Sequence, residues 1–437
     1  MTRTGSIHET PVVRAGITIP GIHRLATYRA EGGYQALRQA LAMDPPEVIG
    51  IVTDSGLTGR GGANFPTGRK WRAVLEAPGA ATAVVNGDES EPGSFKDREM
   101  METLPHRVLE GALIAAHAVR ATALVVFIRG EYDLARERML AAIDEARADG
   151  IIGGWMPLDV TLHRSAGAYI CGEETALIEA LEGERPMPRG KPPYPAVSGL
   201  HGLPTLVNNV ETLANVPAIV ARGAAWYRTL GTPDAPGTRV FSLSGNVRHP
   251  GNYECVLGTR LSDLIEGLGG GVPGDRPIKA VIPGGTSSPV LTARQLDVAL
   301  TPAALTRAGS MLGTAAVIVY DDTTCMVDVA ANLSLFYRDE SCGKCTPCRE
   351  GTFLFHAILT RIENGLGRPD DLERLEQICH YIPGESLCAL GDAAVAPVAS
   401  TLKHFRGEYL THIREGRCPV RRQHEVAGQC FPVIHAT

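Results

Sequence analysis

The chain lacks the sequence features that mark several large classes of protein. It has no long run of lysine or arginine, and its formal net charge of −6 argues against a nucleic-acid-binding surface. Residues 1–20 contain no apolar signal-peptide core, and the most apolar stretch, residues 111–128, is interrupted by His117 and Arg120. We therefore expect no membrane span, and ten cysteines without a secretory signal favour a reducing compartment. If the protein works at a membrane, we expect partner proteins to dock it there.

Familiar catalytic motifs are also missing. No nucleophile with histidine and aspartate partners stands out, and there is no H-E-x-x-H motif. These absences are typical of an enzyme whose chemistry is supplied by cofactors. Hydrophobic residues (44%) and charged residues (21%) are at ordinary levels for a soluble globular protein. A chain of 437 residues is long enough for roughly two to four domains.

The strongest positive signal is a cysteine motif in the last quarter of the chain. Cys342, Cys345 and Cys348 have C-x2-C-x2-C spacing, and a lone Cys388 follows. Three thiolates at this spacing converge when the backbone curls through a turn into a helix, and a fourth from a distant segment completes the shell of an iron–sulfur cluster. In the common two-cluster motif a fourth cysteine follows after three intervening residues, before a proline. Here Arg-Glu-Gly at residues 349–351 is not followed by a cysteine, so a single cluster with a remote ligand fits better.

Two other uses of these cysteines are less well supported. Structural zinc usually takes two separated C-x2-C pairs, and no second pair exists here. A thioredoxin-like redox pair would not need three overlapping cysteines, and no thioredoxin-like β-α-β pattern precedes them. We therefore favour the cluster, with zinc second. Spacing alone leaves the fourth ligand open, because Cys379, Cys418 and Cys430 are also available.

The region from about residue 82 to residue 181 alternates between strand and helix patterns. We expect strands at 82–86, 123–128 and 159–163, and helices at 105–120, 132–148 and 173–181. This alternation predicts an α/β fold with a parallel sheet covered by helices. Ligands bind beyond the carboxyl ends of the strands in such sheets, and polar clusters near Asp88 and Glu173 fall at that edge.

The second half of the chain predicts two further units. A β-β-α-β order follows a linker at 233–237, with strands at 239–243, 252–256 and 279–282 and a short helix from Leu261. This order suggests a small ubiquitin-like module. After a last strand at 315–320, segments 327–337, 352–364, 370–381 and 392–405 predict a four-helix bundle with the cysteines on its loops. The expected domains are 1–71 (an N-terminal segment with a glycine-rich loop), 72–236 (α/β), 237–325 (ubiquitin-like) and 326–437 (helical).

A glycine-rich segment is the second strong motif. Residues 59–71 read GRGGANFPTGRKW, and their glycines permit positive φ and close approach of the backbone to a ligand. Arg60, Arg69 and Lys70 supply charge that would neutralise phosphate, so a nucleotide-binding loop is the functional interpretation. The segment is neither a Walker loop nor a dinucleotide G-x-G-x-x-G after a strand. An ordinary glycine-rich surface loop is the alternative, and the residues alone do not separate the two.

Three polar motifs accompany it. Residues 86–93 form an acidic turn whose carboxylates would accept hydrogen bonds from ribose or ribityl hydroxyls, although a solvated acidic loop is the simpler explanation. Residues 168–175 place Glu173 and Glu174 where a strand enters a helix, so these residues serve either as hydroxyl acceptors or as caps of the helix N-terminus. Residues 207–212 offer side-chain amides for a heterocyclic edge, with loop or cap duty as the alternative.

Taken together, these motifs resemble the NADH-binding, flavin-carrying subunit of bacterial NADH–quinone oxidoreductase (complex I). The similarity runs from about Gly32 to about Tyr409, and its motifs are highly specific in combination. They are residues 59–71, 86–98, 167–175, 191–200, 208–212 and 340–351. The resemblance implies a Rossmann-like FMN- and NADH-binding domain, a ubiquitin-like (SLBB) module and a C-terminal helical domain that carries a [4Fe-4S] cluster.

The resemblance also implies roles for individual residues. The implied cofactor-binding positions, including much of the glycine-rich loop, are Gly59, Arg60, Gly61, Gly62, Phe65, Lys70, Asn86, Asp88, Glu89, Ser90, Glu91, Tyr169, Gly172, Glu173, Glu174, Tyr194, Val207, Asn208, Asn209 and Thr212. Among them, those that would line the NADH site are Phe65, Lys70, Glu91, Tyr169, Glu174 and Tyr194. The implied cluster ligands are Cys342, Cys345, Cys348 and Cys388, since residues 386–392 resemble the family's fourth-ligand segment.

Two positions depart from the family pattern. Asn64 stands where the family normally has glycine, and its side chain adds bulk close to the expected cofactor. Asparagine tolerates a left-handed conformation better than most residues, so the turn is expected to survive. Tyr194 stands where related chains often have phenylalanine, and its ring can still stack.

The resemblance implies that NADH gives a hydride to FMN and that single electrons then pass to the cluster and on toward quinone. The expected partners are the thioredoxin-like [2Fe-2S] subunit and the larger multi-cluster subunit of complex I, at the cytoplasmic side of the bacterial inner membrane. The nearest alternative is the diaphorase subunit of a soluble NAD-dependent formate dehydrogenase or NAD-reducing hydrogenase. Those chains often carry a longer N-terminal segment than the roughly 30 residues found here, which favours complex I. A cluster-binding scaffold that has lost its flavin is a third hypothesis.

Overall fold

Four parallel strands form the centre of the first half of the chain in this computed structural model, which describes residues 7–420. They are β1 (Ala81–Gly87), β2 (Ala121–Ile128), β3 (Asp159–Arg164) and β4 (Thr205–Asn209), in the order β3-β2-β1-β4. Strands β1, β2 and β3 confirm the strands predicted at 82–86, 123–128 and 159–163. The fourth was not predicted as a strand, because only five residues separate Pro204 from the helix that starts at Val210.

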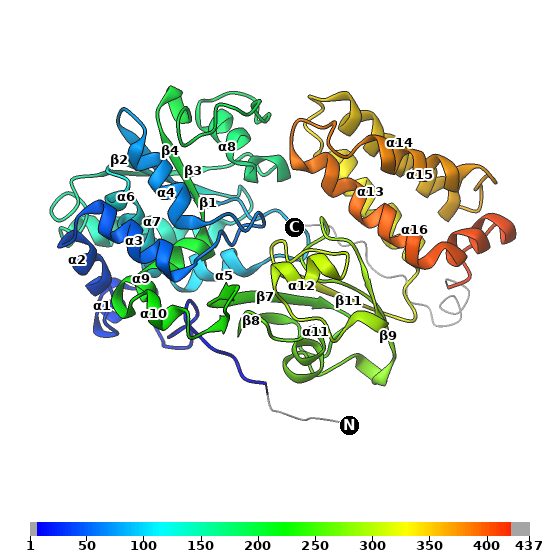
Figure 1. The fold of residues 1–437 in the computed structure, drawn as a ribbon, viewed down its shortest axis with the longest axis horizontal. Helices are drawn as coiled ribbons and strands as arrows, with labels where there is room; N and C mark the ends of the chain where they lie inside the picture. Colours follow the sequence, from blue (N-terminus) through cyan, green and yellow to red (C-terminus); the bar gives the residue numbers. More distant parts are fainter. Residues whose placement is uncertain (1–6, 421–437) are drawn as a thin grey trace.

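Helices surround this sheet (Figure 1). Their bounds are α1 (Leu25–Ala30), α2 (Gln35–Leu41), α3 (Pro45–Ser55), α4 (Thr67–Glu76), α5 (Lys96–Thr103), α6 (Pro105–Ala118), α7 (Asp133–Ala148), α8 (Glu174–Leu181), α9 (Val210–Arg222) and α10 (Ala224–Tyr227). Short 3-10 turns lie at η1 (Tyr169–Gly172) and η2 (Leu200–Gly202), and a small hairpin at β5 (Gly231–Thr232) and β6 (Ala235–Pro236). Helix α6 is apolar on nearly every side because it lies inside, packed against α2, α7, α9 and the sheet. The N-terminal helices share one hydrophobic core with the sheet, so residues 7–71 do not form a core of their own.

A mixed five-stranded sheet follows. Its strands are β7 (Thr238–Gly245), β8 (Gly251–Val256), β9 (Ile278–Ile282), β10 (Leu291–Thr292) and β11 (Ala316–Asp321), in the order β10-β9-β11-β7-β8. Strands β7 and β11 are parallel at its centre, and the others pair antiparallel. The helical turns are α11 (Leu261–Asp263), a π-helical turn at Leu264–Leu268, η4 (Pro273–Asp275), η5 (Ala293–Gln295) and α12 (Pro302–Arg307). The predicted ubiquitin-like order is confirmed in this module, which has its own hydrophobic core.

The helices α13 (Met326–Glu340), α14 (Thr346–Glu363), α15 (Asp371–Tyr381) and α16 (Ala389–Glu415) form a bundle at one end of the molecule (Figure 1). The prediction that the cysteines lie on loops is wrong for Cys348, which lies in the first turn of α14. Cys345 and Cys388 are the N-cap residues of α14 and α16. Helix α14 starts early because Pro347 suits its first turn, where no intrahelical N–H bond is lost. Helix α16 continues ten residues past its predicted end at Phe405, where the backbone is locally non-helical.

Candidate functional site

The polar motifs meet where the sheet changes its winding direction. Strand β1 pairs with β2 on one side and with β4 on the other, and the chain reaches β2 before β4. Ligands of doubly wound sheets bind at such a point, beyond the carboxyl ends of the strands. Asn86, next to last in β1, is the register partner of Asn209, the last residue of β4. The acidic turn and the amide motif therefore lie side by side.

The glycine-rich segment forms a closed loop over this edge. A bridge between Thr58 and Pro66 and a hydrogen bond from Gly59 N to Phe65 O (2.8 Å) close it. A Cβ on Gly61 would lie 3.1 Å from the Cβ of Asn209, so a larger residue would crowd the contact between loop and strand.

Asn64 lies within this loop. It adopts a φ of 52°, as expected for a left-handed turn, and its side-chain amide donates to Gly62 O at 3.1 Å. Its buried Oδ1 atom has no hydrogen-bond partner among residues 7–420. Asn64 thus keeps the turn and leaves one acceptor atom available at the loop.

The side chain of Arg60 points away from this loop. Its guanidinium donates to Tyr227 Oη and to Thr238 O, each at 3.1 Å, and the residue is 1% exposed. This placement contradicts the expectation that its charge neutralises a ligand phosphate. Arg69 lies instead with its guanidinium 5.7 Å from the ring of Phe65, which is 43% exposed. The exposed aromatic rings expected in the NADH site are thus Phe65 and Tyr194, the latter 58% exposed.

The carboxylates of the acidic turn have different surroundings. Glu89 accepts hydrogen bonds from the backbone amides of Asp97 and Arg98, each at 3.0 Å, and so holds the start of α5. Glu91 accepts from Tyr169 Oη at 2.7 Å and from Ser287 N at 2.8 Å. The contacts of Asp88 are longer, from Ser90 Oγ at 3.2 Å and Ser165 Oγ at 3.3 Å. Asp88 therefore keeps the most capacity to accept further hydrogen bonds.

Burial dominates the protonation of these acids. It raises the pKa of Asp88 and that of Glu89 to about 7, and it also raises the pKa of Glu91. The cause is the loss of water around each carboxylate, which the positive charges of Arg129 near Asp88 and Lys96 near Glu89 offset only in part. A hydroxyl group that donated to Asp88 would stabilise the charged form and bring its pKa back down.

The N-cap and first residue of α8, just after η1, carry two more carboxylates. Glu173 is the N-cap of α8, with its carboxylate accepting from Thr175 N and Ala176 N at 2.9 Å, so the cap alternative is realised. Glu174 is held by Lys70 Nζ at 3.1 Å and Lys191 Nζ at 2.9 Å. Burial would raise the pKa of Glu174, but these two ammonium groups lower it below its usual value. Glu174 is thus a fixed, partly exposed negative charge.

The amide motif of β4 is largely engaged with the protein. Asn208 Oδ1 accepts from Trp71 Nε1 at 2.8 Å, and Val207 O accepts from Lys70 Nζ at 3.2 Å. Asn209 caps α9, and its Nδ2 donates to Asp97 at 2.6 Å. Thr212 Oγ1 accepts from Arg60 N at 2.8 Å. These contacts fix the shape of the β4 edge.

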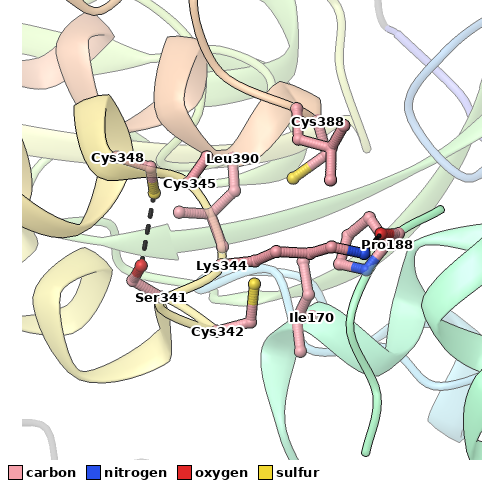
Figure 2. A pocket seen from close by; sticks show the side chains of 10 residues that line it. Ile170, Pro188, Ser341, Cys342, Lys344, Cys345, Cys348, Cys388 and Leu390 are labelled. Atoms are coloured by element: carbon pink, nitrogen blue, oxygen red, sulfur yellow. Dashed lines mark hydrogen bonds between the residues drawn. The ribbon is translucent and has the colours of Figure 1, made fainter. Parts of the chain in front are cut away.

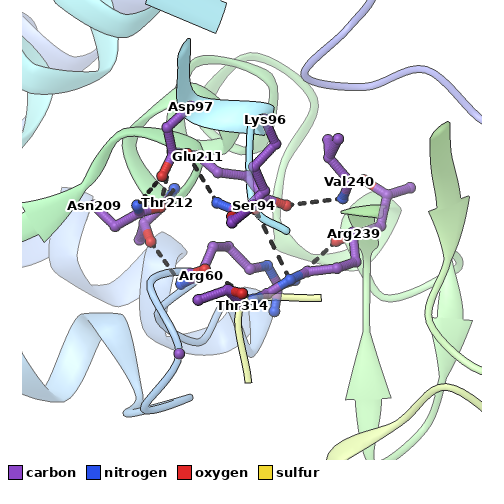
Figure 3. A network of polar contacts seen from close by, with 12 residues as sticks. Arg60, Ser94, Lys96, Asp97, Asn209, Glu211, Thr212, Arg239, Val240 and Thr314 are labelled. Carbon is purple, nitrogen blue, oxygen red and sulfur yellow. Dashed lines mark hydrogen bonds and ion pairs between the residues drawn. The ribbon is translucent and has the colours of Figure 1, made fainter. Parts of the chain in front are cut away.

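A network of buried ions lies behind this edge (Figure 3). Lys96 Nζ contacts Asp97 at 2.8 Å and Glu211 at 2.9 Å. Arg239 of β7 lies 3.8 Å from Glu211, and it donates to the backbone carbonyl of Arg60 at 2.8 Å. The network therefore connects α5, α9 and the glycine-rich loop to the ubiquitin-like module.

The four predicted cluster cysteines come together (Figure 2). Cys342, Cys345, Cys348 and Cys388 line one small cavity of about 10 Å³, with Ile170, Pro188 and Leu390 among the other lining residues. Burial raises the pKa of Cys348 and that of Cys388 to about 11, and neighbouring cysteines add to the shift. Thiols in such surroundings stay protonated without a metal and are the ligands that iron takes as thiolates. Of the other cysteines available by spacing, Cys379 and Cys418 do not line this cavity, and Cys430 lies outside the described residues.

The turn η1 connects the sheet edge to the cysteines. Gly172 O accepts from Asn86 Nδ2 at 3.0 Å, and Ile170, two residues earlier, lines the cysteine cavity. Tyr169 N donates to Glu340 of α13 at 2.9 Å, and the Tyr169 ring lies 5.2 Å from that of Phe336. One helical turn therefore separates the two predicted cofactor sites.

Several residues at the site were not predicted individually. Lys191 contacts both Glu173 and Glu174, Ser165 contacts Asp88, and Asp97 contacts Asn209. Lys191 lies in a Pro/Gly-rich connection that has no pattern of its own. Its charge, opposite to that of the two glutamates, and its place at the start of the family-like motif 191–200 were the available signals.

Three family models match the chain in order. They are the Nuo51 FMN-binding domain at residues 52–218, the SLBB domain at 239–319, and the NADH-ubiquinone oxidoreductase-F iron-sulfur binding region at 328–412. These matches confirm the predicted fold class. Within residues 7–420 no helix has the length and apolar character needed to cross a membrane.

Similar proteins are found among curated sequences and solved structures. The chain is 51% identical to the NADH-quinone oxidoreductase-F 2 subunit of Rhizobium meliloti (strain 1021), over 94% of this chain and 99% of that one. It is 48% identical to the NADH-quinone oxidoreductase-F subunit of Mycobacterium tuberculosis (strain ATCC 25618 / H37Rv), over 94% and 95%. A crystal structure of NAD+-reducing [NiFe]-hydrogenase in the air-oxidized state superposes with a TM-score of 0.81 at 35% identity, over 94% of this chain and 67% of that one. The chain belongs to the NADH-quinone oxidoreductase-F family.

Proposed function

We propose that the chain is the NADH dehydrogenase subunit of a bacterial complex I, with FMN at the β1–β4 edge and a [4Fe-4S] cluster on the four cysteines. The single observation that carries the proposal is the position of η1. Its Gly172 contacts Asn86 at the polar sheet edge, and its Ile170 lines the cysteine cavity. A hydride acceptor and a one-electron acceptor placed on either side of one turn are suited to electron transfer.

The residues at the sheet edge fit a flavin nucleotide. Gly61 lets the loop pack closely against Asn209 of β4, and Asp88 has spare acceptor capacity. Donors and acceptors of this kind recognise ribityl hydroxyls and a heterocyclic edge. We assign the FMN surroundings to the loop 59–62, Lys70, Asn86, Asp88, Glu89, Ser90, Gly172, Glu173, Val207, Asn208, Asn209 and Thr212. FMN held by these residues would supply the means to accept a hydride and to release its two electrons one at a time.

The nicotinamide substrate would enter beside the two exposed rings. Phe65 and Tyr194 offer faces for stacking, and Glu174 offers a carboxylate that Lys70 and Lys191 hold in place. Tyr169 and Glu91, joined by a hydrogen bond of 2.7 Å, close the site on the side of the ubiquitin-like module. These residues orient the dinucleotide, which is the protein's main contribution when cofactors supply the chemistry.

The residues around the cysteine cavity fit an iron–sulfur cluster. All four lining thiols come from helix starts or the turn before α14, and apolar side chains shield them. We assign Cys342, Cys345, Cys348 and Cys388 as the ligands. The domain limits 1–71, 72–236, 237–325 and 326–437 stay a prediction, with the shared core of residues 13–240 arguing against a separate first domain.

The visible spectrum of the anaerobically purified chain tests this function. We expect flavin bands that bleach when NADH is added, together with a broad iron–sulfur absorbance. Cys388→Ser should lose most of its iron, whereas Cys379→Ser, which removes a cysteine outside the cavity, should keep it. Cluster absorbance without a bleachable flavin would instead support the scaffold that has lost FMN.

We further propose that the partners are the thioredoxin-like [2Fe-2S] subunit and the multi-cluster subunit of complex I, at the cytoplasmic side of the bacterial inner membrane. The names of the curated relatives support a place in complex I. The structural neighbour, an NAD+-reducing hydrogenase, keeps the soluble diaphorase as the second candidate. Purification of the native complex decides between them: co-purification of those two subunits supports complex I, and a nickel–iron or molybdenum subunit supports the alternative.

A further inference from the structure

A second group of metal-binding side chains lies in the helical bundle, separate from the cluster cysteines. It consists of Cys325, Glu363, His412 and Cys418, whose ligand atoms all lie within 4.8 Å of one another. All four residues are buried. The FMN, NADH and cluster assignments use none of them.

Three chain segments bring these side chains to one point. Cys325 is the N-cap of α13, just after strand β11, and Glu363 is the last residue of α14. His412 lies in the last turn of α16. Gly416 ends α16 in a left-handed conformation (φ 63°), which turns the chain back so that Cys418 joins the group. Convergence from three segments is a built arrangement rather than the product of one local sequence motif.

The contacts within the group are short. His412 Nε2 lies 3.1 Å from Glu363 Oε2 and 3.5 Å from Cys325 Sγ, and Cys325 Sγ lies 3.9 Å from Glu363 Oε2. Ligands about 2.0–2.3 Å from a tetrahedral zinc ion stand roughly 3.3–3.8 Å from one another. The observed separations bracket that range, so small side-chain adjustments would complete the shell.

A hydrogen bond to the backbone orients the ring of His412 as in metal-bound histidines. His412 Nδ1 donates to the backbone carbonyl of Glu408 at 2.8 Å, which leaves Nε2 as the nitrogen that faces the two sulfurs and the carboxylate. A metal-bound histidine almost always donates its other ring N–H to a carbonyl or carboxylate, which fixes its tautomer and orientation. Glu408 is itself fixed, because it accepts from Met326 N at 2.9 Å and contacts Lys279 Nζ at 2.6 Å.

We propose that Cys325, Glu363, His412 and Cys418 form a structural zinc site at the base of the helical domain. Two thiolates and an imidazole favour zinc over the oxygen-preferring cations magnesium and calcium. Four protein ligands fill a tetrahedral shell and leave no position for substrate, which is typical of a structural rather than a catalytic site. The ion would fasten the ends of α14 and α16 to the point where the chain leaves the ubiquitin-like module.

Two metal-free arrangements compete with this proposal. In the first, His412 is an imidazolium paired with Glu363: burial would lower the pKa of His412, but hydrogen bonds with Cys418 and Glu363 raise it to about 10. In the second, Cys325 and Cys418 form a disulfide in an oxidising environment. Both predict a protein without zinc, so metal content separates them from the proposal.

The test is metal analysis of the full-length chain, purified anaerobically from zinc-replete medium. We expect about one zinc per chain beside about four irons. Cys418→Ser and His412→Gln should lower zinc by about tenfold or more while iron stays unchanged. Cys379→Ser, a cysteine of α15 outside both groups, should retain both metals.

Three results would overturn the site. They are wild-type protein that takes up no zinc even after equilibration with it, zinc that persists at wild-type level in both ligand variants, and a Cys325–Cys418 disulfide in the anaerobic protein. If the ligand variants do not fold, zinc-edge X-ray absorption of the wild type decides. Sulfur neighbours at about 2.3 Å together with lighter atoms at about 2.0 Å support the site, and a shell of light atoms alone refutes it.

Discussion

Asn64 occupies a backbone conformation that favours glycine, at the point where the cofactor is expected to approach. With φ at 52°, a side chain branched at Cβ would collide with the following carbonyl, at a cost of about 1–2 kcal/mol. Asn64→Val should therefore lower both the thermal midpoint and FMN affinity. Asn64→Gly should bind FMN at least as tightly as the wild type, because the strain and the bulk are both removed. Fluorescence titration of the flavin-depleted protein with FMN measures the affinity.

The control for the two Asn64 variants is Gly50→Ala. Gly50 lies in the middle of α3, where an added Cβ meets nothing within 4 Å. It should leave FMN affinity unchanged. Tighter FMN binding by Asn64→Val than by the wild type would show that the loop does not adopt this turn in solution.

Glu174 sets the expected preference for NADH over NADPH. Its carboxylate stays charged between Lys70 and Lys191, whereas Glu91 is buried and already occupied by Tyr169 and Ser287. A negative charge beside the adenosine ribose repels a 2′-phosphate. Glu174→Gln should raise the KM for NADH about tenfold, the loss of one charge-assisted hydrogen bond, and should raise the NADPH/NADH ratio of kcat/KM.

Glu179→Gln is the matched control, since Glu179 lies on the same helix and pairs with Arg189. It should change neither the KM nor the ratio. Efficient NADPH oxidation by the wild type would contradict the preference itself.

His106, buried in the first turn of α6, contacts a residue at the start of α2 and a residue of α7. His106 Nδ1 lies 2.9 Å from Tyr34 Oη, and Nε2 lies 3.2 Å from Glu145 of α7. Burial lowers the pKa of His106 to about 4. Above pH 6.5 the folded and unfolded states hold the same proton count at this site, but between pH 6.5 and pH 4 only the unfolded state is protonated. The free energy of unfolding should fall by up to about 3 kcal/mol as pH drops through this window.

A comparison of the wild type with His106→Gln isolates the contribution of His106 to the pH dependence of the free energy of unfolding. Asp88 and Glu89, whose pKa values are raised, contribute with the opposite sign in both proteins and cancel in the difference. Denaturant unfolding at pH 7.5 and pH 5 should show a smaller pH effect for His106→Gln. The largely exposed His201→Gln should behave like the wild type. Equal slopes for all three proteins would rule out a neutral buried His106.

Individual elements were predictable where the pattern was long. Helix α6 and strand β2 follow from long apolar patterns, and the ubiquitin-like order follows from spaced strands and turns. Strand β4 was not found, because five residues carry too little pattern. The start of α14 was placed six residues too late, because glycine and proline near its first turn resemble a loop.

Across the whole molecule, the buried ions around Glu211 join the flavin-site region to the ubiquitin-like module. Glu211 is fully buried between Lys96 and Arg239, so Glu211→Gln would leave two positive charges without a full counter-charge. Breaking a buried ion pair by removing one partner costs about 3–5 kcal/mol. We expect a clearly lower unfolding midpoint.

Glu102→Gln serves as the control for Glu211→Gln. It removes the half-exposed pair with Arg98, worth at most about 0.5 kcal/mol. Equal midpoints for the two variants would mean that the buried network adds nothing to the joint between the modules.

The site as a whole was only partly predictable. The types of residue and their place at the sheet edge followed from motifs and strand order. The direction of each side chain did not, because it depends on distant partners: Arg60 turns inward to Tyr227 and Thr238, and Glu89 turns to the start of α5. The group around Cys325 was also invisible, since its members are spread over 94 residues from Cys325 to Cys418.

The starts of α14 and α16 affect the reduction potential of a cluster bound in the cysteine cavity. Cys345 and Cys388 are the N-caps of helices of 18 and 27 residues, so the positive ends of two helix macrodipoles point at the same cavity. Added negative charge is favoured by these two helix ends, so their contribution alone raises the reduction potential of a cluster held by these cysteines. This contribution is set by backbone orientation rather than by any charged side chain.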